Sequence, residues 1–150
     1  STAFADTDEK KETRKKGIAF IKEHGAFHFL KTTIPNLYST ATKETAPALI
    51  ENQVASVTTF SDETLIANYE AMIQRPDRTG VLRNLNVPVL FVFGKWDTAV
   101  PLQSGLAQCT FAQLAYIHVL DHSGHMGMQE EWEKSLAILN HYLSETAGLL

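Results

Sequence analysis

The spacing of apolar residues indicates that the first half of the chain is helical. Over residues 1–78, apolar side chains recur at intervals of three and four, and no segment alternates with the two-residue period of a half-buried strand. A first helix is expected to begin near Asp6, with Glu9 as its capping partner. Ser61 is suited to cap a later helix that ends before Pro76. This region is therefore predicted to contain several helices and no strand.

After residue 78 the pattern changes to two short apolar runs, each followed by a helical segment. Residues 87–93 and 114–120 are rich in β-branched and aromatic residues without polar alternation, which is typical of strands buried on both faces of a parallel sheet. Helices are expected over residues 101–108 and 130–144. The second of these has one apolar stripe, made of Trp132, Leu136, Leu139 and Leu143. The order strand, helix, strand, helix predicts a parallel pair joined by a right-handed crossover.

Composition and charge narrow the class of protein. With 150 residues, 44% of them hydrophobic, the chain is long enough for one domain with a packed core. The formal charge of −4 and the lack of a long basic block argue against nucleic acid as a partner. No apolar run approaches the ~20 residues of a membrane helix, and the lone Cys109 fits a reducing compartment. We expect a cytoplasmic protein with no membrane contact, no cofactor and no bound metal.

Each predicted strand leads into a turn with one ionisable side chain of interest. Asp97 lies in VFGKWDTAVP after the first strand, and His125 lies in HSGHMG after the second. Loops at the carboxyl ends of parallel strands face one crevice, and there a carboxylate can orient a histidine that takes a proton from a nucleophile. Gly94, Gly124 and Gly127 are expected to give the two turns unusual backbone angles and a close approach. Taken alone, an Asp after a strand is also common as a helix cap, and a His between glycines is often just exposed.

The same segments resemble a known family. LRNLNVPVLFVFGKWDTAVP, residues 82–101, is similar to the part of α/β-hydrolases that ends in their acid turn, and SGHMGMQEE, residues 123–131, is similar to their histidine turn. The resemblance implies that Asp97 is the acid of a catalytic triad and that His125 is its general base. It also implies an α/β fold class: a partial α/β-hydrolase fold, with a helical cap or lid over residues 1–78. Residues 79–150 would form the C-terminal part of the core, with its last two parallel strands and their helices.

The chain departs from the family pattern because it lacks the nucleophile. In α/β-hydrolases the nucleophile precedes the acid and the histidine on a G-x-S-x-G elbow, which this sequence does not contain. Ser104 lacks the first glycine of the elbow, and Ser123 lies in the histidine turn itself. The chain, which begins at Ser1 without an initiator methionine, is therefore expected to be a C-terminal fragment, inactive alone, of an enzyme acting on a small ester or related acyl substrate. We expect its small sheet to be held by the missing N-terminal half or to self-associate through its exposed edge.

Two other functions compete with the hydrolase interpretation. H-x-x-D-H-x-x-H, residues 118–125, looks like a zinc motif, but four residues of strand span roughly 13 Å, too far for shared ligation of one ion. The second alternative is a non-catalytic helical interaction module, which gives no reason for Asp97 and His125 to lie within hydrogen-bond reach. Four residues are candidate substrate contacts, although such side chains more often only pack: Phe27, Asn36, Trp96 and Met126.

Overall fold

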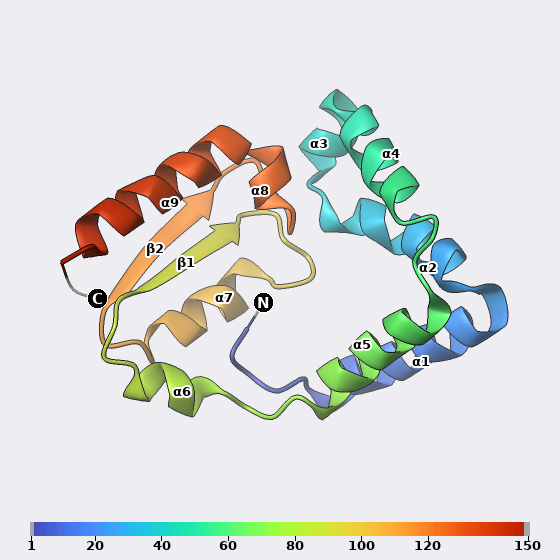
Figure 1. Ribbon diagram of the computed structural model, residues 1–150, viewed down its shortest axis with the longest axis horizontal. Coiled ribbons are helices and arrows are strands. Elements are labelled where there is room, and N and C mark those ends of the chain that lie inside the picture. The colour runs from blue at the N-terminus through green and yellow to red at the C-terminus, as the bar shows by residue number, and fades with distance from the viewer. Residues whose placement is uncertain (1, 149–150) are drawn as a thin grey trace.

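The first half of the chain folds into a layer of short helices. The computed structural model describes residues 2–148, and this half contains α1 (Asp8–His24), α2 (Ala26–Thr33), a 3₁₀ helix (Ile34–Leu37), α3 (Thr40–Thr45), α4 (Pro47–Ser56) and α5 (Asp62–Gln74). α1 and α5 lie side by side and run in opposite directions (Figure 1). One cluster of buried residues joins α1, α2 and α5, and it contains Ile21, Ala26 and Leu65. A second cluster joins the 3₁₀ helix to α4, and it contains Ile34, Tyr38 and Ile50.

The second half contains a two-stranded parallel sheet between helices. Its elements are α6 (Thr79–Asn84), β1 (Val89–Gly94), α7 (Leu102–Cys109), β2 (Ala115–Leu120), α8 (Gly127–Glu130) and α9 (Trp132–Thr146). The two strands pair in parallel, from Val89 opposite Ala115 to Gly94 opposite Leu120. α7 covers the sheet face that carries Phe91, and α9 lies on the opposite face (Figure 1). Both strands predicted from the apolar runs are confirmed, within two residues at each end.

The helix caps follow the sequence signals in one case and depart from them in another. Ser61 caps α5 as predicted, because its side chain accepts a hydrogen bond from the N–H of Thr64. The cap of α1 is Thr7, which accepts from the N–H of Lys10, so the assignment of Asp6 to this position was wrong. Asp6 is buried and binds the guanidinium of Arg14 instead. That ion pair draws its carboxylate away from the end of the helix.

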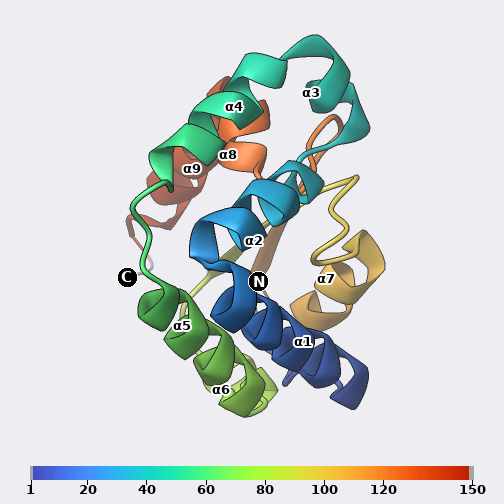
Figure 2. The same cartoon turned by 90° about the vertical axis from the view of Figure 1, so that its right-hand side faces the viewer.

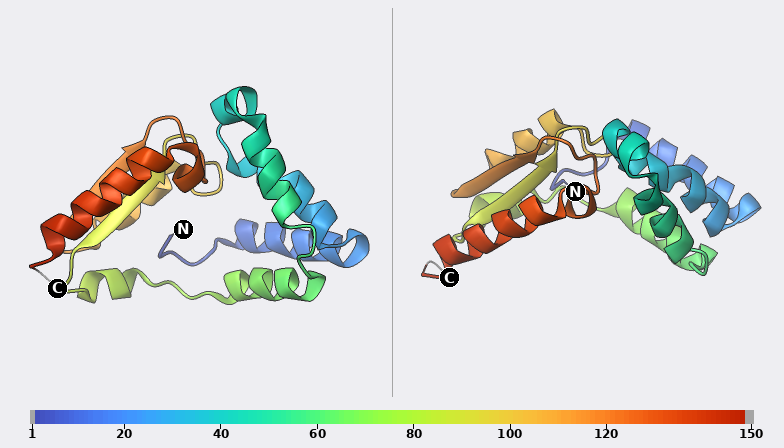
Figure 3. Two further views of the ribbon diagram at one scale, coloured as in Figure 1. Left: turned by 45° about the horizontal axis from the view of Figure 1, so that its top comes forward. Right: turned by 90° about the horizontal axis from the view of Figure 1, so that it is seen from above.

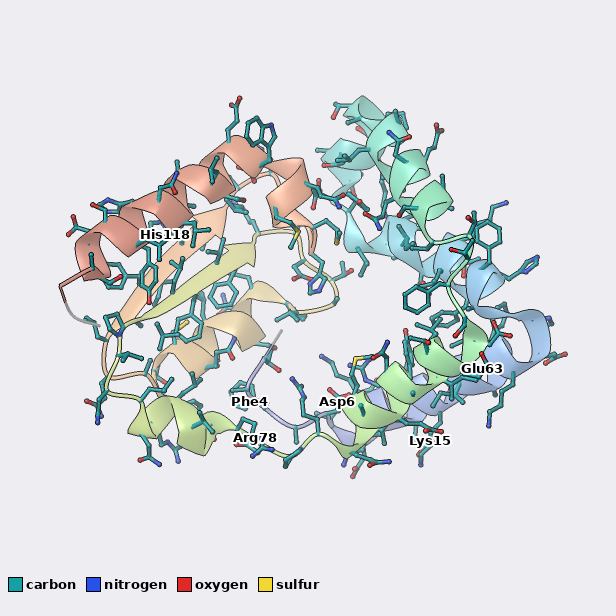
Figure 4. The ribbon with its side chains drawn as sticks, viewed as in Figure 1. Phe4, Asp6, Lys15, Glu63, Arg78 and His118 are labelled. Carbon is teal, nitrogen blue, oxygen red and sulfur yellow. The ribbon has the colours of Figure 1, made fainter. Side chains whose placement is uncertain are left out.

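The chain passes between its two halves at a neck, which we define as residues 2–6 and 75–78. The Arg75 guanidinium donates to the carbonyls of Thr2 at 2.7 Å and Phe4 at 2.8 Å. The N–H of Arg78 donates to the carbonyl of Ala3 at 2.6 Å. Figure 4 shows Phe4 and Arg78 close together at this crossing. The predicted boundary at residue 78 falls in the neck, where residues 2–6 and residues 75–78 are hydrogen-bonded to each other.

One apolar side of the sheet half has no covering layer among residues 2–148. The predicted stripe of α9 (Trp132, Leu136, Leu139 and Leu143) is 44% to 59% exposed, and Val92 on β1 is 40% exposed. β1 pairs with β2 along one edge, and no described strand pairs with its other edge. Seen from above, the two halves form an arch that is open on the side of β1 and α9 (Figure 3). Separately, no helix among residues 2–148 is long and apolar enough to cross a membrane.

Candidate active site

The turns that follow β1 and β2 bring Asp97 and His125 together. Nδ1 of His125 lies 2.7 Å from Oδ2 of Asp97. The other carboxylate oxygen, Oδ1, accepts hydrogen bonds from the N–H groups of Ala99 and Val100, both at 2.8 Å. The backbone of the acid turn therefore holds one oxygen of Asp97, and the second oxygen is directed to the imidazole.

The electrostatics of the pair determine which imidazole nitrogen carries the proton. Burial is the largest influence on Asp97 and raises its pKa, but the hydrogen bonds from His125, Val100 and Ala99 together outweigh it, so the pKa of Asp97 lies below its ordinary value. An ionised carboxylate can only accept hydrogen bonds. In the neutral imidazole, Nδ1 of His125 must then carry the proton, and Nε2 keeps a free lone pair. The side chain of His125 is 32% exposed and that of Asp97 only 9%, so the imidazole is the more accessible group of the pair.

Close contact between the two turns depends on glycine. The N–H of Trp96 in the acid turn donates to the carbonyl of Ser123 in the histidine turn at 2.9 Å. A Cβ atom on Gly94 would lie 1.8 Å from the carbonyl oxygen of Gly124, so a larger residue could not occupy this position unless the turns moved apart. The expectation of unusual backbone angles here was wrong, because Gly25 is the only glycine with positive φ among residues 2–148. These glycines are needed for close approach alone.

The carboxylate of Glu130 joins the histidine turn to the helical half. Its Oε1 accepts the N–H of Gly124 at 2.7 Å. Its Oε2 accepts the N–H of Ser39 at 2.8 Å and the hydroxyl of Thr42 at 2.7 Å. Only the fold brings Glu130 to Ser39 and Thr42, because these residues lie far away in the sequence.

The helical half also holds the histidine turn through the backbone. The N–H of His125 itself donates to the carbonyl of Leu37 at 2.7 Å. A Cβ atom on Gly124 would lie 2.7 Å from the same carbonyl oxygen. The position of the imidazole is therefore set from two sides: by Asp97 through the ring, and by the 3₁₀ helix through the backbone.

The neighbouring Glu131 organises the buried side of the histidine turn. Its Oε2 accepts the hydroxyl of Ser123 at 2.6 Å and the N–H of His122 at 2.9 Å. Burial raises the pKa of Glu131, whereas these hydrogen bonds and the nearby Lys134 lower it. The lowering is the larger effect, so the pKa of Glu131 lies below its ordinary value. Ser123 is completely buried and its proton is engaged by Glu131. Its hydroxyl is therefore not presented for attack on a substrate.

An apolar groove of about 370 Å³ leads along β1 to the pair. Asp97 and His125 line one end of it, and the rest is lined mainly by apolar side chains of β1, α8 and α9, among them Val92, Met128 and Leu139. The groove therefore runs along β1, whose other edge no described strand covers. Groups placed in it would lie beside the imidazole.

The four candidate substrate contacts lie outside this groove, and a role in binding substrate stays a prediction for each. Trp96 is exposed, and its Nε1 donates to a carbonyl of the turn after β2. The carbonyl of Asn36 accepts the hydroxyl of Thr98 in the acid turn. Met126 packs against the second cluster of the helical half. Phe27 is half-buried on α2.

The residues of H-x-x-D-H-x-x-H take other partners. Asp121 pairs with Lys134 at 3.3 Å and with Lys95 at 3.8 Å. His118 lies within β2, opposite Val92. Among residues 2–148, no three His, Cys, Asp or Glu side chains are grouped so that they could hold a metal ion.

Comparisons with known proteins identify the fold. No protein-family model matches the chain. Its sequence is 27% identical over 95 residues to the biotin biosynthesis bifunctional protein BioHC of Teredinibacter turnerae, and the aligned part covers 63% of this chain and 17% of that protein. Its structure is similar to a thermophilic esterase from Thermogutta terrifontis with malate bound, with a TM-score of 0.88 and 24% identity. It is also similar to the enol-lactonase from Burkholderia xenovorans, with a TM-score of 0.82 and 18% identity.

These two structures show how much of the fold the chain contains. The similarity covers 97% and 95% of this chain, but only 53% of each of the other two chains. The chain therefore spans about half the length of the solved structures that it matches. It has part of the α/β-hydrolase fold, as predicted: a helical region followed by two parallel strands and their helices.

Proposed function

We propose that this chain supplies the general base and the orienting acid of an α/β-hydrolase, whose complete form cleaves a small ester or a related acyl compound. The observation that carries the proposal is the 2.7 Å contact between Asp97 and His125 at the carboxyl ends of two parallel strands. A non-catalytic helical module gives no reason for such a contact. The names of the two similar structures, an esterase and an enol-lactonase, support an acyl substrate.

In the proposed reaction, His125 carries one proton from the nucleophile to the leaving group. Nε2 takes the proton of an attacking hydroxyl while the oxygen bonds to the acyl carbon, and the negative charge of Asp97 stabilises the imidazolium that results. The imidazolium then gives the proton to the alkoxide as the ester C–O bond breaks. A water molecule repeats both steps on the acyl intermediate, which releases the acid. Asp97 stays ionised throughout and acts by orienting and stabilising His125.

The attacking hydroxyl in this proposal belongs to a residue outside these 150. Ser123 is buried against Glu131, and Ser104 lies within α7 and in neither turn. The groove along β1 is the place for the segment that carries the nucleophile, because it ends at His125 and follows an unpaired strand edge. In the complete protein, a strand beside β1 and a helix over the exposed stripe of α9 would bury the apolar side that this chain leaves open.

The activity test uses substitutions in the complete enzyme with p-nitrophenyl acetate as substrate. Asp97→Asn is expected to lower kcat by about 10⁴, because the wrong histidine tautomer then faces the nucleophile. Asp121→Asn is the matched control, since Asp121 is an exposed carboxylate close to the same turn, and it is expected to leave kcat unchanged. Near-normal turnover of Asp97→Asn would remove Asp97 from the mechanism. The 150-residue chain alone is expected to show no turnover above that of free imidazole.

The association test uses the isolated chain in sedimentation velocity experiments. We expect it to self-associate through the open side of β1 and α9, and Leu139→Glu is expected to shift it towards monomer. Val81→Glu is the control, because Val81 is an apolar residue on α6 with a similar exposure, 51% against 44% for Leu139. A wild-type chain that sediments as a single monomeric species would contradict the proposed exposed interface.

A further inference from the structure

A second cavity of the described chain lies away from the groove that holds His125. It has a volume of about 750 Å³ and lies between α1, α2 and the middle of the loop that joins β1 to α7. Figure 2 shows α1 and α2 from this side, with that loop beside them. The volume is within the range of small-molecule sites, roughly 300–1,000 Å³. The proposed reaction assigns no role to this cavity.

The walls of the cavity carry more positive than negative charge, although the protein as a whole is acidic. Lys10, Arg14 and Lys16 line it together with one carboxylate, Glu9. The formal charge of the lining is therefore +2 (3 − 1), against −4 for the whole chain. Asp6 binds Arg14 and offsets part of this charge. The ammonium group of Lys16 forms no hydrogen bond or ion pair within residues 2–148, although its charge helps to lower the pKa of Glu12. Lys10 donates only to a backbone carbonyl, that of Ala99.

Most of the threonine hydroxyl groups that line the cavity are already engaged as donors. Thr13 donates to the carbonyl of Glu9, Thr33 to that of Phe29, and Thr98 to that of Asn36. Of the three cationic side chains in the lining, Arg14 is bound by Asp6, so the groups best placed to bind an anion are the ammonium groups of Lys10 and Lys16.

The inner surface of the cavity is aromatic. The rings of Phe29 and Tyr69 meet edge to face at 5.4 Å, and those of Phe20 and Phe29 lie 6.0 Å apart. Gly17 lets these rings approach α1, because a Cβ atom there would come within 3.3 Å of both Phe29 and Tyr69. The cavity thus combines an aromatic floor with a cationic rim.

We propose that this cavity binds a small organic anion, with its ring or short apolar body on the aromatic floor and its acidic group at Lys10 and Lys16. The contact of Lys10 with Ala99 places the acidic group beside the acid turn, because the N–H of Ala99 is bound by Asp97. This inference goes beyond the proposed hydrolase function and does not rest on it.

The test is a titration of the ¹⁵N-labelled chain, followed by the NMR shifts of the Gly17, Thr33 and Ala99 amides. Benzoate is the probe, and benzamide is its neutral counterpart of the same shape. We expect benzoate to shift these amides and benzamide to bind at least fivefold more weakly. Phenyl phosphate distinguishes the two sources of negative charge, since binding of either anion supports the site and the tighter one identifies the acidic group.

Charge substitutions locate the anion. Lys10→Gln and Lys16→Gln are each expected to weaken benzoate binding by about two- to fivefold, the range of exposed ion pairs. Lys22→Gln is the matched control, because Lys22 is an exposed lysine of α1 that does not line the cavity. His125→Ala is expected to leave benzoate binding unchanged. A failure of benzoate to bind and a failure of the hydrolase proposal are therefore separate results. The proposal is overturned if benzamide binds as tightly as benzoate, or if neither anion shifts these amides at millimolar concentration.

Discussion

Removal of the Glu130 carboxylate is expected to loosen the junction between the helical half and the histidine turn. Three hydrogen bonds end on it, from Gly124, Ser39 and Thr42, all within 2.8 Å. A hydrogen bond to a charged group contributes about 1.5–3 kcal/mol, and a buried N–H left without a partner costs about 1–3 kcal/mol. All three donors belong to buried residues. The hydroxyl of Thr42 has a second partner in the hydroxyl of Ser39, so the two N–H groups are the donors that would be left in this state.

The three contributions share one carboxylate and do not simply add. We therefore expect Glu130→Ala to lower the free energy of unfolding by about 3–5 kcal/mol. For a chain of this size each kcal/mol corresponds to roughly 2–4 °C, so the melting temperature should fall by about 10 °C. Glu130→Gln keeps an acceptor for one of the donors and is expected to lose about half as much free energy.

Urea unfolding and native-state hydrogen exchange measure these effects. The amides of Ser39 and Gly124 should exchange faster in Glu130→Ala, whereas the amide of Val89, which donates to Leu114, serves as a reference in the sheet. Glu133→Ala is the matched control, because Glu133 is an exposed carboxylate in the first turn of α9. If Glu130→Ala costs no more than Glu133→Ala, the reasoning from these contacts is wrong.

Two further predictions concern stability. Gly94→Ala is expected to lower the free energy of unfolding in urea by about 3 kcal/mol or more, because its Cβ would meet the backbone of Gly124. Gly80→Ala is the control and should be neutral or stabilising, because the space around Gly80 is open. Equal losses in the two variants would contradict the argument. Asp6 and Asp97 have lowered pKa values, so each binds fewer protons in the folded than in the unfolded chain. Their stabilising effect is therefore present at pH values above the ordinary pKa of 3.8 and is lost as the pH falls through their lower folded-state pKa values. Melting temperatures measured from about pH 6 down to pH 3 should show this loss, and Asp6→Asn should make it smaller; an unchanged profile would count against a role for Asp6.

Elements that depend on near neighbours in the chain were predictable. The cap of α5 at Ser61 and the two strands follow from a few consecutive residues, and the structure confirms them. The start of α1 shows where local signals fail. Asp6 and Thr7 are both good capping residues, and the choice between them is made by Arg14 and Arg75, which take the carboxylate of Asp6. Arg75 reaches Asp6 only through the fold.

The candidate site was predictable in its two ionisable groups but not in the contacts that hold them. Asp97 and His125 stand out because each follows an apolar run, and the structure places their side chains in contact; their catalytic roles stay predictions. The bond between Glu130 and Ser39 joins residues 91 positions apart, so no local pattern reveals it. Similarly, the apolar stripe of α9 indicates a face suited to burial but not the partner that would cover it.

The neck has a consequence for how such a protein can change. Its two segments are held together by Arg75 and by the hydrogen bond from Arg78 to Ala3. The helical segment between them therefore begins and ends at neighbouring points of the structure. Insertions whose ends lie close together disturb the host structure least. The helices between the two neck segments can therefore be lengthened, shortened or replaced as one unit while the sheet half keeps its fold. The exception is the stretch from Leu37 to Thr42, because any segment that replaced it would have to reproduce its contacts with the histidine turn.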